Sequence, residues 1–90
     1  MKISDMLEAL IEGQKLVIEI PQDKEAKPFA KSLYCSLKTA QRRFVERYSA
    51  QPFSDGEVIK VRILEEGKFI EVLIVAQNNE RYKVVDISPQ

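Results

Sequence analysis

The chain has 90 residues, of which 44% are hydrophobic, and its 14 basic residues balance 14 acidic ones. This length suits a single small domain, and no apolar run approaches the roughly 20 residues that span a bilayer. The absence of histidine, the single cysteine and the three widely spaced glycines exclude a zinc finger, an internal disulfide, a P-loop and a dinucleotide-binding loop.

The first two predicted elements are a short helix and a strand. A helix over residues 4–12 can be capped by Ser4 or Asp5 and ends at Gly13. Its apolar residues recur at helical spacing: Met6, Leu7, Leu10 and Ile11. Residues 15–20 predict a strand, because they are rich in β-branched side chains and a proline follows them.

The central part of the sequence predicts the longest helix. Regular helix is expected from about Pro28 to about Ser49, after a loose or bent first turn that Asp23 can cap. At 100° per residue, an apolar stripe faces the core along one side and consists of Phe29, Leu33, Leu37, Ala40, Phe44 and Tyr48. Residues 51–56 contain proline, aspartate and glycine and predict a loop.

The last third of the sequence predicts a meander of three strands, 57–64, 69–76 and 81–87, joined by turns at 65–68 and 77–80. The middle strand is the most apolar, so we expect it at the centre of the sheet. The element order is α-β-α-β-β-β. It predicts an α+β fold: a mostly antiparallel four-stranded sheet with a short and a long helix packed on one face. The pairing position of strand 15–20 stays open.

The long helix coincides with the basic part of the chain. Residues 24–47 hold seven of the fourteen cations and only two acids, Glu25 and Glu46, for a net charge of +5, whereas the segments before and after carry −3 and −2. Two neighbouring lines on its exposed side have residues spaced 4, 3 and 4: Lys31, Cys35, Lys38 and Arg42 in the first, and Ser32, Ser36, Thr39 and Arg43 in the second. Such a surface favours a polyanion or an acidic partner.

Double-stranded DNA is the predicted partner of this helix. Lysine and arginine supply Coulomb attraction and counterion release, and short hydroxyl side chains supply close hydrogen bonds to phosphate. Arginine and glutamine can also reach base edges in the major groove. We therefore expect a small DNA-binding protein of the regulatory or accessory kind, of a size common among phage- and plasmid-encoded chains. The predicted nucleic-acid-binding residues are Lys31, Ser32, Ser36, Lys38, Thr39, Gln41, Arg42, Arg43 and Arg47.

Two other interpretations compete with DNA binding. The basic helix could dock on an acidic protein, as a small inhibitor or adaptor, or its charges could simply solvate an outer helix face, as most charge runs do. Against solvation, the helix offers only Glu46 for an i,i+4 pair, to Arg42. Because one helix with about five cations binds weakly, we expect a homodimer, formed through the exposed sheet face or the edge strand 81–87.

Catalysis, a metal ion and a cofactor are not expected. A nucleophilic mechanism at Cys35 needs a base, and histidine is absent. Neighbouring cations would make an exposed Cys35 thiol reactive, whereas a small residue tolerated in a contact face is the simpler interpretation. The N-terminus lacks the apolar centre of a signal peptide, so we expect a cytoplasmic protein without a membrane segment.

Overall fold

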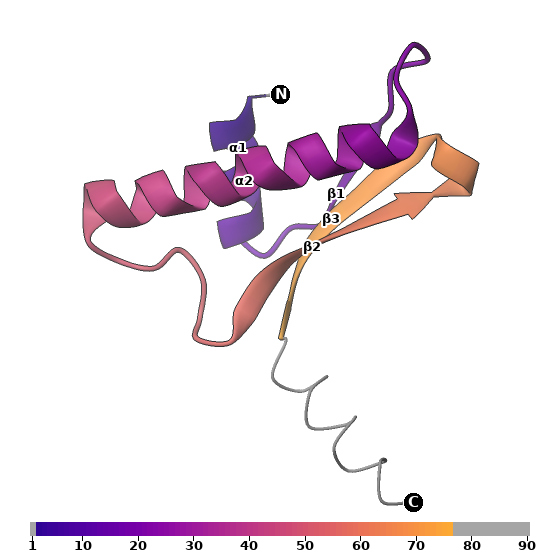
Figure 1. Cartoon of the computed structure of the whole chain (residues 1–90). Coiled ribbons are helices and arrows are strands. Elements are labelled where there is room, and N and C mark those ends of the chain that lie inside the picture. Colours follow the sequence, from indigo (N-terminus) through magenta and orange to yellow (C-terminus); the bar gives the residue numbers. More distant parts are fainter. Residues whose placement is uncertain (1, 77–90) are drawn as a thin grey trace, which may run out of the picture.

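The structure is a computed structural model that describes residues 2–76 (Figure 1). It has an α+β architecture, in which two helices pack against a three-stranded antiparallel sheet within this range. The elements in chain order are α1 (Ile3–Ile11), β1 (Leu16–Glu19), α2 (Ala26–Tyr48), β2 (Glu57–Leu64), the 3₁₀ turn η1 (Glu65–Gly67) and β3 (Phe69–Ala76).

The sheet has the strand order β1-β3-β2, and both pairings are antiparallel. β3 lies between the other two strands, as its apolar sequence predicts. β1 takes the position that the sequence left open, with Leu16 opposite Val72. The predicted four-stranded sheet is wrong for the described residues: β1 occupies the side of β3 along 69–72 that a strand folding back after β3 would need. The predicted strand 81–87 itself lies outside the described residues.

α1 begins without the predicted side-chain cap. Lys2 stands at the N-cap position in an extended conformation, and no side chain there makes a capping hydrogen bond, so the caps predicted at Ser4 and Asp5 are wrong. The end at Gly13 is confirmed. Gly13 has φ +87°, a conformation that glycine adopts without steric cost, and its N–H donates to the carbonyl of Leu10 at 3.0 Å.

α2 begins at Ala26, two residues before the predicted start at Pro28. Proline is tolerated there because the first N–H groups of a helix have no intrahelical acceptor, so the missing N–H of Pro28 costs no hydrogen bond. The chain is already regular at this point, since the N–H of Phe29 donates to the carbonyl of Glu25 at 3.2 Å. The predicted bend in the first turn is therefore wrong.

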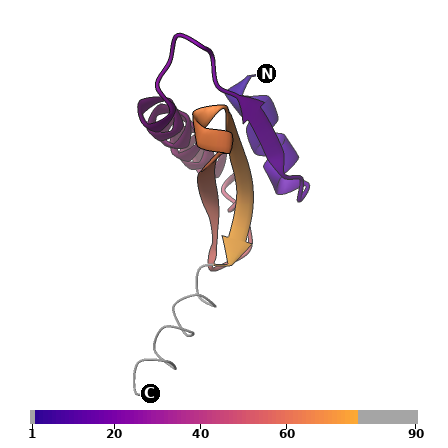
Figure 2. The ribbon, with the colours of Figure 1, turned by 90° about the vertical axis from the view of Figure 1, so that its right-hand side faces the viewer.

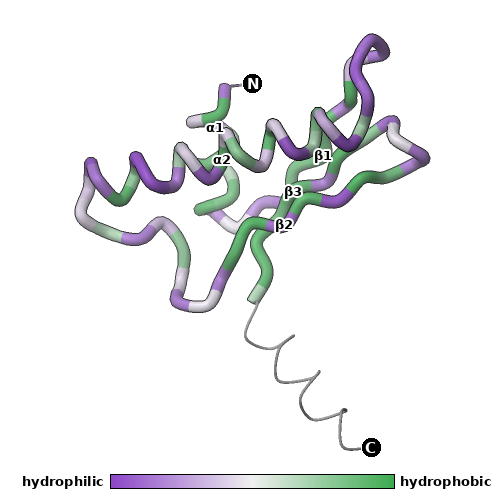
Figure 3. The backbone as a smooth tube through the Cα atoms, in the orientation of Figure 1, coloured by the Kyte–Doolittle hydropathy of each residue, from purple (hydrophilic) through white to green (hydrophobic). Residues whose placement is uncertain are grey.

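One hydrophobic core lies between the two helices and one face of the sheet. In Figure 2, α2 is seen nearly end-on at one side of β2 and β3, and in Figure 3 the trace of β3 is hydrophobic along most of its length. The register places Val61 opposite Val72, on the face that also carries Ile70. Both helices and the central strand supply the fully buried side chains, which are Leu10, Leu37, Ile70 and Val72.

The last turns of α2 extend past the sheet (Figure 1). Leu33 and Leu37 are buried, as the apolar stripe predicts, but Phe44 is only half-buried and Tyr48 is 58% exposed. The prediction that Tyr48 faces the core is wrong. Helical periodicity identifies the inward side of a helix, but it does not say how far the underlying sheet continues.

Candidate polyanion-binding surface

α2 presents six cationic side chains, all of them exposed: Lys27, Lys31, Lys38, Arg42, Arg43 and Arg47. The ion pairs within residues 2–76 both involve Glu71, and neither includes a residue of α2. Glu46, at i+4 from Arg42, is exposed and does not pair with it. No cation of the helix is therefore engaged in an ion pair within the described part of the chain.

The cations of α2 are divided between two sides of the helix. At 100° per residue, four of them fall within about 60° of one another, and Lys60 of β2, which extends from the sheet face opposite the core, shares a hollow with one of these four, Lys31. Lys31 and Lys60 line the same hollow between α2 and β2, together with the ring of Tyr34. We call this surface the basic flank, made of Lys27, Lys31, Lys38, Arg42 and Lys60.

The second line of residues predicted from the sequence lies on the side of α2 that faces α1. It consists of Ser32, Ser36, Thr39 and Arg43. These residues line an open groove of about 650 Å³ between the two helices, whose α1 wall includes Ile3, Leu7, Glu8 and Ile11. We call it the α1–α2 groove. The predicted binding residues that line it are Ser32, Ser36, Thr39, Arg43 and Arg47. The structure thus keeps Lys31, Lys38 and Arg42 on one side of the helix and turns this hydroxyl-bearing line toward α1, with Thr39 bordering both the groove and a hollow that includes Lys38 and Arg42.

Two further polar residues of α2 are Gln41 and Cys35, and they differ in their exposure. The Oε1 atom of Gln41 is buried and has no hydrogen-bond partner among the described residues, so in this conformation it is not presented to a base edge. The side chain borders a shallow hollow that also includes Lys38 and Arg42. Cys35 is exposed and stands at the margin of the α1–α2 groove.

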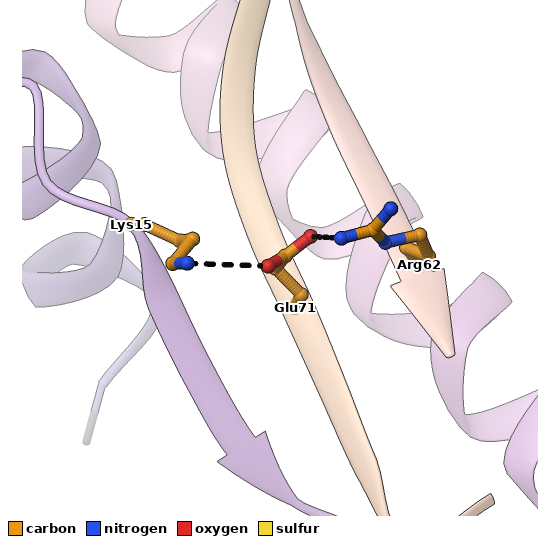
Figure 4. A network of polar contacts seen from close by, with 3 residues as sticks. All are labelled: Lys15, Arg62 and Glu71. Carbon is orange, nitrogen blue, oxygen red and sulfur yellow. Dashed lines mark ion pairs between the residues drawn. The ribbon is translucent and has the colours of Figure 1, made fainter. Parts of the chain in front are cut away.

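Glu71, in the middle of β3, determines which cations of the sheet are free. Its carboxylate is buried on the sheet face opposite the core, with Lys15 Nζ 3.4 Å from Oε2 and Arg62 Nη2 2.6 Å from Oε1 (Figure 4). Arg62 lines the same hollow as Lys31 and Lys60, but its charge is engaged. The sequence signal for this cluster is a lone acid inside an otherwise apolar strand, which predicts a cationic partner across the sheet.

The wider chemistry of the described residues is limited. No group of three or more His, Cys, Asp or Glu side chains between residues 2 and 76 is placed to hold a metal ion. None of the helices in that range is both long and apolar enough to cross a membrane. Comparison of the chain with models of protein families, with curated proteins and with solved structures finds no match.

Proposed function

We propose that this protein binds double-stranded DNA through the basic flank, as a regulatory or accessory factor. The observation that carries the proposal is a row of exposed cations on one helix, none of them paired with a carboxylate in residues 2–76. An exposed cation left unpaired by its own protein keeps its full attraction for phosphate, and each phosphate that it neutralises releases counterions.

The dimensions of the flank support contact with the phosphate backbone. Lys27 and Arg42 are fifteen residues apart on α2, a rise of about 22 Å, which is the axial length of roughly six base pairs. α2 packs on the sheet along one side and on α1 along another. The basic flank can therefore lie along a duplex, and the proposal assigns the main contacts to phosphates, which position a protein without reading sequence.

The strength of binding should depend steeply on salt. If all five cations of the basic flank neutralise phosphates, the slope of log K against log salt concentration is about −4.5, at about −0.9 per phosphate. An acidic protein surface lacks the condensed counterion atmosphere of a duplex, so a shallower dependence would favour a protein partner.

The test compares two double variants that remove equal charge. Lys38→Ala with Arg42→Ala removes two cations from the basic flank, and Lys2→Ala with Lys68→Ala removes two exposed cations from outside α2. Binding is measured by fluorescence anisotropy over a salt series on a random-sequence duplex, a single strand and an RNA of the same length. Circular dichroism checks that each variant is folded.

We expect the flank variant to lose affinity for the duplex and to have a slope shallower by about 1.8. The control variant should keep the wild-type slope to within about 0.5, since distant exposed charges are screened beyond roughly 10 Å. Equal losses in the two variants would contradict the proposal, because only net charge would then matter. Stronger binding to the single strand or to RNA than to the duplex would overturn the assignment to duplex DNA.

A further inference from the structure

The α1–α2 groove gathers apolar side chains that remain accessible to solvent. Ile11 is 37% exposed and Tyr48 58% exposed, and both line the groove together with Phe44. The rings of Phe44 and Tyr48 pack against each other with their centroids 4.7 Å apart. The groove is therefore a preformed hollow with a partly aromatic wall, and an occupant that excluded water from it would gain by the hydrophobic effect.

The two walls of the groove carry charges of opposite sign. α1 contributes Glu8, and α2 contributes Arg43 and Arg47. These groups are exposed and form no ion pair with one another or with any other residue in the described range. The acidic wall and the basic wall can therefore each pair with a wall of opposite charge on another molecule.

We propose that a second copy of this chain occupies the groove and forms a two-fold symmetric dimer. In such an interface, a surface of one copy meets the same surface of the other, so residue i contacts residue j and j contacts i. The acidic α1 wall of each copy then meets the basic α2 wall of the other. Glu8 of one copy faces Arg43 and Arg47 of the second, and the reverse contact forms at the same time.

The shape of α1 supports mutual docking. Ser4, Glu8 and Ile11 are spaced 4 and 3 and all border the groove, so they form a ridge beside a hollow. If the two-fold axis of the dimer runs between ridge and hollow, the ridge of each copy lies in the hollow of the other. This is the ridges-into-grooves packing common between helices. The net charge of zero also leaves no overall repulsion between copies.

This dimer is independent of the proposed DNA binding. It uses the side of α2 that faces α1 and leaves the basic flank accessible. It differs from the dimer surfaces expected from the sequence, which are the open sheet face and strand 81–87. A different occupant, such as an acidic amphipathic helix of another protein, would contact the apolar side chains of the groove and the two arginines, but its binding would not depend on Glu8.

The test is a charge exchange between copies. One variant carries Glu8→Arg and the other carries Arg43→Glu with Arg47→Glu. Each alone places like charges across the proposed interface on both sides of the two-fold axis. When the two variants are mixed, every cross-interface contact again joins opposite charges. Dissociation constants are measured by sedimentation equilibrium, and circular dichroism checks that each variant is folded. The Lys38→Ala, Arg42→Ala variant serves as a control for charge removal elsewhere on α2.

We expect the wild-type chain and the Lys38→Ala, Arg42→Ala control to dimerise equally. Each charge-reversed variant alone should dimerise at least about tenfold more weakly, and the mixture should recover the wild-type dissociation constant to within about threefold. A wild-type chain that stays monomeric, a Glu8→Arg variant that dimerises normally, or a folded mixture that stays monomeric would each overturn the proposal. None of these results depends on DNA, so failure here is distinguishable from failure of the proposed function.

Discussion

The guanidinium of Arg62 on β2 lies 2.6 Å from the carboxylate of Glu71 on β3, measured from Nη2 to Oε1. The side chain of Glu71 is only 7% exposed, whereas that of Arg62 is 59% exposed. Lys15, just before β1, approaches the other carboxylate oxygen. One buried acid therefore joins the central strand to residues on both sides of it, while its two cationic partners stay in water.

Because only the acid is buried, we expect removal of the acid and removal of the base to change the free energy of unfolding by different amounts. Glu71→Leu leaves Arg62 and Lys15 free to turn into solvent, so we expect the free energy of unfolding to change by less than about 1 kcal/mol. Arg62→Ala leaves a buried carboxylate with one fewer partner and should destabilise the protein by about 1–2 kcal/mol. Urea unfolding measures both. A larger loss in Glu71→Leu than in Arg62→Ala would show that the carboxylate itself stabilises the sheet.

Leu37 of α2 is completely buried in the core. Leu37→Ala should lower the free energy of unfolding by about 2–5 kcal/mol, through lost hydrophobic transfer energy and the cavity left behind. The neighbouring exposed Lys38 provides the control, because Lys38→Ala at a helix surface should change stability by less than about 0.5 kcal/mol. Urea denaturation compares the two, and similar midpoints would mean that α2 is not anchored at Leu37.

Glu66, at the turn between β2 and β3, has φ +55° and ψ +33°. This left-handed conformation costs a residue with a Cβ roughly 1–2 kcal/mol, part of which is offset by the greater freedom of glycine in the unfolded chain. Glu66→Gly should therefore stabilise the protein by about 0.5–1 kcal/mol in thermal unfolding. The same change in a helix, Glu46→Gly, should destabilise it by about 1 kcal/mol. Destabilisation by both would argue against the left-handed turn.

Cys35 is exposed on α2. Cys35→Ser replaces one small side chain with another at a solvated position, so we expect less than about 0.5 kcal/mol change in the free energy of unfolding and unchanged affinity for duplex DNA. Both quantities are measured on the same preparation. A large loss of DNA affinity with stability retained would assign a functional role to the thiol.

Much of the local structure follows directly from the sequence. The β-branched runs predict β1, β2 and β3, the 3.6-residue apolar period predicts α2, and Gly13 predicts the end of α1. The partner of β1 could not be read in this way, because its alternating pattern identifies a buried face but not the strand that pairs with it. The pairing of Leu16 with Val72 depends on contacts between segments 56 residues apart.

The candidate site was harder to predict than the fold. The sequence placed the two lines of α2 side by side on one exposed surface, and periodicity alone supports that arrangement. In the structure, the position of α1 distinguishes the two lines. α1 packs beside Ser36 and Arg43, so the second line becomes one wall of the α1–α2 groove. The sequence of α1 shows that it has an apolar face, but not which side of α2 it will contact.

The place of β3 at the centre of the sheet has a consequence for biosynthesis. β1 and β2 both pair with this strand, which is the last of the described elements to leave the ribosome. The helices can form early because their contacts are local, but the sheet cannot close until β3 is available, and such long-range contacts form slowly. A nascent chain that stalls before Phe69 would leave the apolar faces of β1 and β2 uncovered and open to chaperones or proteases.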